Sequence, residues 1–169
     1  GRAESHEAGG WLRVIKLDPV RGTPVAKHAY ALAPIPLRRS SGEGRAAVSR
    51  AENGLTDLLA VSEDSFIAVE RAYVPGEGVT VRLVLARIEA ATTDVSQIKS
   101  LPGAAFQPMS RQLLLALPIA LNSLQLDNIE AIARGPVLAN GNRSLVLVSD
   151  NNFSRLQTTQ FLALEVVPP

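Results

Sequence analysis

Acid and amide side chains gather at the ends of two apolar stretches near the C-terminal end of the chain. The first stretch opens with Asp127, Asn128 and Glu130, and the second closes with Asp150, Asn151 and Asn152. Carboxylate and amide oxygens are the ligands that Ca²⁺ prefers, so Asn128, Glu130 and Asp150 are predicted metal ligands. A metal that polarises the scissile group would leave Glu130 or Asp150 to act as catalytic base. This chemistry is metal-assisted hydrolysis.

The same residues also have a structural interpretation. Asp127 and Asn128 would cap a turn through hydrogen bonds from side chain to backbone. Asp150, Asn151 and Asn152 would form a loop that uses the tolerance of Asn and Asp for unusual backbone angles. Both interpretations stay open at the level of the sequence.

Most of the chain alternates apolar and polar residues between turn signals, which predicts β-strands. The acid and amide side chains are therefore expected at the ends of strands. The expected strands cover residues 11–17, 25–32, 55–61, 66–71, 79–88, 111–117, 129–134, 144–150 and 159–167. Residues 111–117 are rich in helix formers, but Pro118 follows and favours a strand. Residues 33–52 hold prolines, arginines, serines and glycines without apolar periodicity and are expected to form a long loop.

An internal repeat is predicted from this order of strands. Residues 54–60 align with residues 128–134, and residues 66–71 align with residues 145–150. Repeated four-stranded units of roughly 40–50 residues are typical of β-propeller blades. The sequence therefore predicts an all-β chain with two to three blades, each a four-stranded antiparallel meander. A propeller closes with at least about four blades, so residues 1–169 are expected to be the C-terminal part of one propeller domain whose N-terminal half completes the ring. An independent small β-sandwich is a weaker alternative.

Composition excludes several classes of function. Seventeen Lys and Arg residues against sixteen Asp and Glu residues leave a net charge of +1, which favours neither nucleic acid nor an anionic membrane as a partner. There are no cysteines, which excludes disulfides, thiolate metal sites and a cysteine nucleophile. No apolar run reaches the roughly 20 residues that span a membrane. Motifs of serine hydrolases, P-loop proteins and paired-histidine zinc sites are missing from the sequence.

Several segments in order resemble the phytase-like domain family, which is described by the esterase-like activity of phytase. The resemblance runs from about residue 11 to residue 166 and rests on the segments 53–60, 68–71, 80–83, 127–130, 148–153 and 160–162. It implies a bacterial-type protein with a β-propeller fold that is exported, and therefore periplasmic or secreted. A small phosphate or ester compound is the ligand that the resemblance implies.

Two hypotheses follow for function. In the first, the protein is a metal-dependent hydrolase of phosphate monoesters or small esters, with Glu130 and Asp150 at the mouth of a channel. In the second, it is a non-catalytic propeller that binds a ligand or partner. The candidate ligand-binding residues are Asn53, Asp57, Glu70, Arg71, Asn128, Asn151 and Asn152. For Glu70 and Arg71, which point to opposite faces of one strand, a structural ion pair is favoured over ligand binding.

Overall fold

The computed structural model describes residues 2–3, 5, 7–36, 51–121 and 124–167. These residues form eleven strands and no helix. The strands are β1 (Gly10–Leu17), β2 (Pro24–Leu32), β3 (Glu52–Ala60), β4 (Ser65–Val74), β5 (Gly78–Arg87), β6 (Ser110–Leu117), β7 (Ala120–Leu121), β8 (Leu124–Gln125), β9 (Ile129–Arg134), β10 (Arg143–Ser149) and β11 (Phe161–Val166). The described part of the chain thus contains no helix that could span a membrane.

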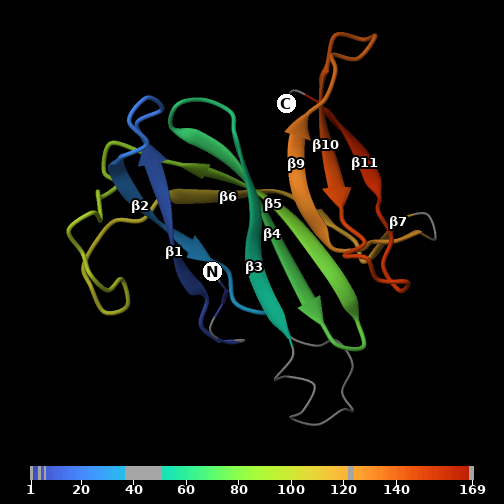
Figure 1. Cartoon of the computed structure of the whole chain (residues 1–169), viewed down its shortest axis with the longest axis horizontal. Coiled ribbons are helices and arrows are strands. Elements are labelled where there is room, and N and C mark those ends of the chain that lie inside the picture. Colours follow the sequence, from blue (N-terminus) through green and yellow to red (C-terminus); the bar gives the residue numbers. More distant parts are fainter. Residues whose placement is uncertain (1, 4, 6, 37–50, 122–123, 168–169) are drawn as a thin grey trace.

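Three antiparallel sheets follow one another along the chain. Strands β3 to β6 form a four-stranded meander in the middle of Figure 1, with the β1–β2 hairpin on one side and the three-stranded sheet of β9, β10 and β11 on the other. Strands β7 and β8 form a separate short pair. The all-β class with antiparallel sheets is confirmed.

All nine expected strands are present, each with ends no more than three residues from the expected ends. Residues 111–117 belong to β6, so the strand interpretation of this helix-forming stretch is confirmed. Two details were wrong. The short strands β7 and β8 were not expected, and the last strand, Phe161–Val166, is shorter than the expected residues 159–167. The expected loop 33–52 falls mostly on residues 37–50, which lie outside the described residues, and β3 already starts at Glu52.

The predicted repeat is confirmed in the strand register. Ala60 pairs with Phe66 in the middle sheet, and their counterparts Arg134 and Leu145 pair in the last sheet. Each pairing also shifts at the same place: Thr56 is skipped in β3 and Glu130 is skipped in β9. A skipped residue is a β-bulge, which bends its strand and increases the local twist.

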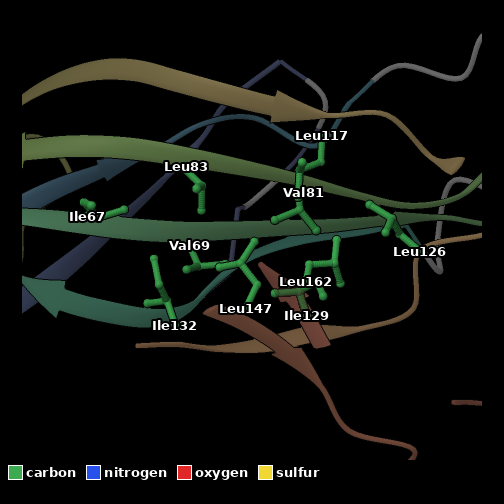
Figure 2. Close-up of a cluster of buried hydrophobic side chains, with 10 residues drawn as sticks. All are labelled: Ile67, Val69, Val81, Leu83, Leu117, Leu126, Ile129, Ile132, Leu147 and Leu162. Atoms are coloured by element: carbon green, nitrogen blue, oxygen red, sulfur yellow. The ribbon is translucent and has the colours of Figure 1, made fainter. Parts of the chain in front are cut away.

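Aliphatic side chains from the facing sheets form the main core. Val69 and Val81 of the middle sheet meet Ile129 and Leu147 of the last sheet, and all four are fully buried. Figure 2 shows these side chains pointing toward one another between the two sheets. A second cluster around Tyr30 and Ala68 fills the space between the β1–β2 hairpin and the middle sheet. Burial of a side chain such as leucine contributes about 1.5–3 kcal/mol, so these two clusters fix how the sheets face one another.

Candidate functional site

A polar pocket of about 600 Å³ opens between the middle sheet and the last sheet. Glu52 comes from the start of β3, Arg71 from β4, and Asp127 and Asn128 from the segment just before β9. Gln157, Thr158 and Gln160, from the loop between β10 and β11, add further polar side chains to its lining. The pocket therefore combines one cationic, two anionic and several amide side chains, a set that suits a small polar ligand.

Arg71 is held in place by an acid. Its Nη1 lies 2.5 Å from Oε1 of Glu52, and the other oxygen of Glu52 lies 3.0 Å from Nη1 of Arg2. The side chain of Arg71 is only 18% exposed. Its Nε is buried and has no hydrogen-bond partner among the described residues. The preference for an ion pair at Arg71 is confirmed, and the pair fixes a guanidinium in the wall of the pocket.

Asp127 organises the opposite wall. One carboxylate oxygen accepts from the backbone N–H of Asn128 at 2.7 Å and from the amide of Gln157 at 3.4 Å, and the other accepts from the N–H of Thr158 at 2.6 Å. These bonds tie the loop after β10 to the start of β9. The capping interpretation of Asp127 is thereby confirmed.

The side chains of Asn128 and Glu130 meet, although the bulge at Glu130 interrupts strand alternation. The amide Nδ2 of Asn128 donates a short hydrogen bond to Oε1 of Glu130. No described residue donates to Oδ1 of Asn128 or to Oε2 of Glu130. Each of the two side chains therefore keeps one free oxygen close to the polar pocket.

Asp150 lies at the same end of the sheet. Ser149 pairs with Ile129, so Asp150 follows the last pair of β10 at the point where Asn128 precedes β9. Its side chain is exposed and makes no hydrogen bond or ion pair with the described residues. Among those residues, no group of three or more His, Asp and Glu side chains gathers as a metal site. A calcium ion would therefore depend on two carboxylates and one amide, with water completing its usual six to eight oxygen ligands.

Asn151 and Asn152 shape a turn, which bears out their structural interpretation. The side-chain oxygen of Asn151 accepts from the N–H of Phe153 at 3.1 Å, and Asn152 has a positive φ of 48°. The side chain of Asn152 contacts Gln157 at 3.3 Å. Neither asparagine lines the polar pocket, but both position the loop that does.

Glu70 is fully buried between the β1–β2 hairpin and the middle sheet. It accepts a hydrogen bond from Tyr30 at 2.6 Å and a short one from Arg111, and it lies 3.5 Å from Arg82. Burial, together with the charge of Glu70, raises the pKa of Tyr30 far above its ordinary value. The favoured structural ion pair is confirmed for Glu70 as well, which leaves no surface of this carboxylate for an external ligand.

Asn53 and Asp57 also lie outside the polar pocket. Asn53 is fully buried and donates to the Ala33 carbonyl at 2.8 Å, which anchors the chain that leaves β2. Oδ2 of Asp57 accepts from the backbone N–H of Ile132 at 2.8 Å and so connects β3 to β9 across the two sheets. Both residues hold the sheets together.

The structure thus brings only Arg71 and Asn128 of the predicted ligand-binding residues into one pocket, with Glu130 bonded to Asn128. The pocket residues that the sequence did not identify include Glu52, Gln157 and Gln160. An acid that opens a strand and two glutamines in a loop have no distinctive spacing. Only their placement next to Arg71 and Asp127 gives them a role.

Comparisons with known proteins give the family. A family model described as Phytase-like, Esterase-like activity of phytase, matches residues 1–153 of the 169 residues. No curated protein and no solved structure matches the chain. Because the matched residues make up most of the sequence, the chain belongs to the phytase-like family, which is described by the esterase-like activity of phytase.

Proposed function

We propose that the protein is a hydrolase of phosphate monoesters or small esters that binds its substrate in the polar pocket. The observation that carries the proposal is the position of Arg71 and Asn128 in the lining of one pocket, with Glu130 hydrogen-bonded to Asn128. A guanidinium recognises phosphate and carboxylate oxygens. A carboxylate beside the bound group is the usual general base for hydrolysis.

Each residue has a distinct part in this proposal. Arg71, oriented by Glu52, binds the anionic or carbonyl oxygen of the substrate. Glu130 takes a proton from the attacking water, and the amide of Asn128 keeps the carboxylate of Glu130 in one orientation. General base catalysis of this kind contributes about 10²- to 10⁴-fold to the rate.

Calcium is part of the proposal as a cofactor. Asn128, Glu130 and Asp150 would supply the protein oxygens, and support comes from the free oxygens of all three at one end of β9 and β10. Bound calcium would polarise the scissile group and lower the pKa of water. The residue roles given above do not depend on it.

The sheets are proposed to be blades of a β-propeller, with β3 to β6 as one complete blade. The matching bulges in β3 and β9 support this arrangement, because they equate β3 with β9 and β4 with β10. The last sheet then lacks a counterpart of β6, and a strand from the N-terminal half of the propeller would cover the open edge of β11. Limited proteolysis of a longer form that includes this half would detect the covered edge, and unchanged cleavage near β11 would contradict it.

Export is proposed from the family, with a periplasmic or secreted protein as the expectation. Cell fractionation of the source organism tests this part separately. Recovery of the protein in the cytoplasmic fraction alone would contradict export and would leave the proposed chemistry unaffected.

The test of function is a screen with chromogenic phosphate and short-chain ester substrates. Wild type is compared with Glu130→Gln, Arg71→Gln and the control Glu63→Gln, which changes an exposed acid in the β3–β4 turn. We expect Glu130→Gln to lower kcat at least 100-fold with little change in KM, and Arg71→Gln to raise KM mainly. Substrate binding without turnover in wild type would instead establish the non-catalytic, ligand-binding propeller.

A further inference from the structure

A second pocket of about 350 Å³ lies at the opposite end of the same two sheets. Glu52 at the start of β3 lines the polar pocket, whereas Leu59 near the end of β3 lines this one. In β9, likewise, the polar pocket takes Asn128 before the strand and the second pocket takes Arg134 at its end. With about 3.3 Å per residue along a strand, the two pockets are roughly 20 Å apart and are separate sites.

The second pocket is mainly apolar and is rimmed by arginine. Its aliphatic lining consists of Leu59, Val61, Ile67, Val137, Leu145 and Val166. Ile67 is buried, and Leu59 and Leu145 pack against the main core, so the floor of the pocket is part of the rigid structure. We name it the arginine-rimmed pocket, because Arg134 and Arg143 also line it.

The two arginines differ in how they are held. Nη2 of Arg134 donates to the carbonyls of Ala60 and Val61, at 2.9 and 3.2 Å, which fixes this guanidinium at the β3–β4 turn. The side chain of Arg143 makes no hydrogen bond or ion pair with any described residue. None of the described acidic side chains lines the pocket, so its two positive charges are uncompensated there.

We propose that the arginine-rimmed pocket binds a small amphipathic anion, a single aliphatic chain that ends in a carboxylate or a phosphate. The aliphatic floor would take the chain, and Arg143 together with the free N–H groups of Arg134 would take the anionic head. Charge complementarity favours an amphipathic anion over other ligands. An uncharged apolar compound would provide no negative charge for the two guanidinium groups, and an inorganic anion would leave the aliphatic floor exposed to water. The site is independent of the polar pocket and of the proposed hydrolysis.

The test is calorimetric titration of the whole chain with sodium octanoate, below the concentration at which it forms micelles, because an alkyl phosphate would also be a substrate of the proposed hydrolase. Octanol and acetate serve as comparison probes that lack the anionic head and the aliphatic chain, respectively. We expect octanoate to bind at least tenfold more tightly than either comparison probe. Equal binding of octanol and octanoate would overturn the proposal, because the arginines would then contribute nothing.

Matched variants locate the site. Arg143→Gln is expected to weaken octanoate binding about tenfold or more, whereas Arg155→Gln removes the same charge from an exposed position in the loop after β10 and is expected to leave binding unchanged. Val137→Asp places a negative charge in the lining at a residue that is 68% exposed, so it should abolish binding without unfolding the protein. An equal loss for Arg143→Gln and Arg155→Gln would overturn the proposal as a general charge effect.

Two further experiments test whether the protein binds a lipid surface instead of the free compound, and whether the compound binds in the polar pocket instead of the arginine-rimmed pocket. Sedimentation with anionic phospholipid vesicles is expected to leave the protein in the supernatant, and binding to vesicles in the absence of octanoate binding would overturn the proposal. Arg71→Gln, in the polar pocket, is expected to leave octanoate binding unchanged. A loss of octanoate binding in this variant would move the ligand to the polar pocket and would also overturn the proposal.

Discussion

Thr56 and Glu130 occupy the same position in two matching β-bulges. Thr56 is the residue of β3 left without a partner between the pairs Leu55–Glu70 and Asp57–Val69, and Glu130 has this place in β9 opposite β10. In the middle sheet the bulged side chain turns back, because the hydroxyl of Thr56 donates to the Val69 carbonyl at 3.3 Å. In the last sheet it is a carboxylate that contacts Asn128. The same β-bulge thus holds a side chain that bonds to the backbone in the middle sheet and a carboxylate in the last sheet.

The variant Glu130→Thr places in the β9 bulge the residue type found in the β3 bulge. It separates a structural role of Glu130 from a catalytic one. Because threonine already suits such a bulge, we expect the free energy of unfolding to change by no more than about 1 kcal/mol. Loss of the carboxylate should lower hydrolysis at least 100-fold. Urea unfolding and substrate assays on the same sample make the measurement. A loss of more than about 2 kcal/mol with activity preserved would show that Glu130 is structural.

The buried carboxylate of Glu70 predicts a large effect on stability. Glu70→Ala leaves Arg82 and Arg111 without their partner and removes the acceptor of Tyr30. Removing one partner of a buried ion pair costs about 3–5 kcal/mol, and the partial exposure of both arginines favours the lower end of this range. Urea unfolding measures the loss. Glu63→Ala, which breaks the exposed pair with Lys16, is the matched control and should give no measurable change.

Tyr30 predicts how stability depends on pH. The pKa of its hydroxyl is raised in the folded protein, first by burial and then by the charge of Glu70. Above about pH 10 the unfolded chain loses this proton while the folded protein keeps it. The contribution of Tyr30 to the free energy of unfolding is therefore fully present below about pH 10, and above it the free energy of unfolding falls by about 1.4 kcal/mol per pH unit. Other groups also titrate there, and comparison with Tyr30→Phe isolates this contribution.

The measurement is urea unfolding of wild type and Tyr30→Phe at pH 8, 10 and 11. At pH 8 the variant should be less stable by about 1.5–3 kcal/mol, the typical contribution of a hydrogen bond to a charged group. The difference between the two proteins should shrink from pH 10 to pH 11. A constant difference would mean that the hydroxyl ionises as readily in the folded protein as in the unfolded chain.

Asp57 predicts how firmly the middle and last sheets are joined. Its Oδ2 accepts from the N–H of Ile132, and its Oδ1 accepts from the N–H of Leu58. Asp57→Ala removes a charged acceptor from a partly buried bond and is expected to cost about 1.5–3 kcal/mol in urea unfolding. Asp57→Asn, which keeps one oxygen acceptor, should cost less. Asp64→Ala in the exposed β3–β4 turn is the control, and an equal effect at both positions would contradict the role of Asp57 between the sheets.

Strand periodicity gave the positions of the strands and the repeat, because alternation reports directly which face of a strand is buried. It did not locate the bulges: a bulge shifts the alternation by one residue, and in a strand as short as β9 the two buried residues Ile129 and Ile132 do not show which residue between them is the extra one. The contact between Glu70, Tyr30 and Arg111 depends on how two sheets pack, so it cannot be predicted from the spacing of residues along the sequence. The polar pocket was missed in the same way: the hydrogen bond from the N–H of Thr158 to Asp127 ties the loop that carries Gln157 to the start of β9, and no local spacing predicts this contact.

Calcium binding at Asn128, Glu130 and Asp150 is the last prediction. Two carboxylates and an amide, with water as the remaining ligands, predict modest affinity, since tight calcium sites use more protein oxygens in a preformed cage. Calorimetric titration of wild type with CaCl₂ should give one site, and Glu130→Gln and Asp150→Asn should each weaken it at least tenfold. Glu165→Gln changes an acid that already accepts from Asn140 and Asn142, and it should leave calcium binding unchanged. If wild type binds no calcium while hydrolysis persists in the presence of a chelator, Glu130 acts without a metal and the calcium site is wrong.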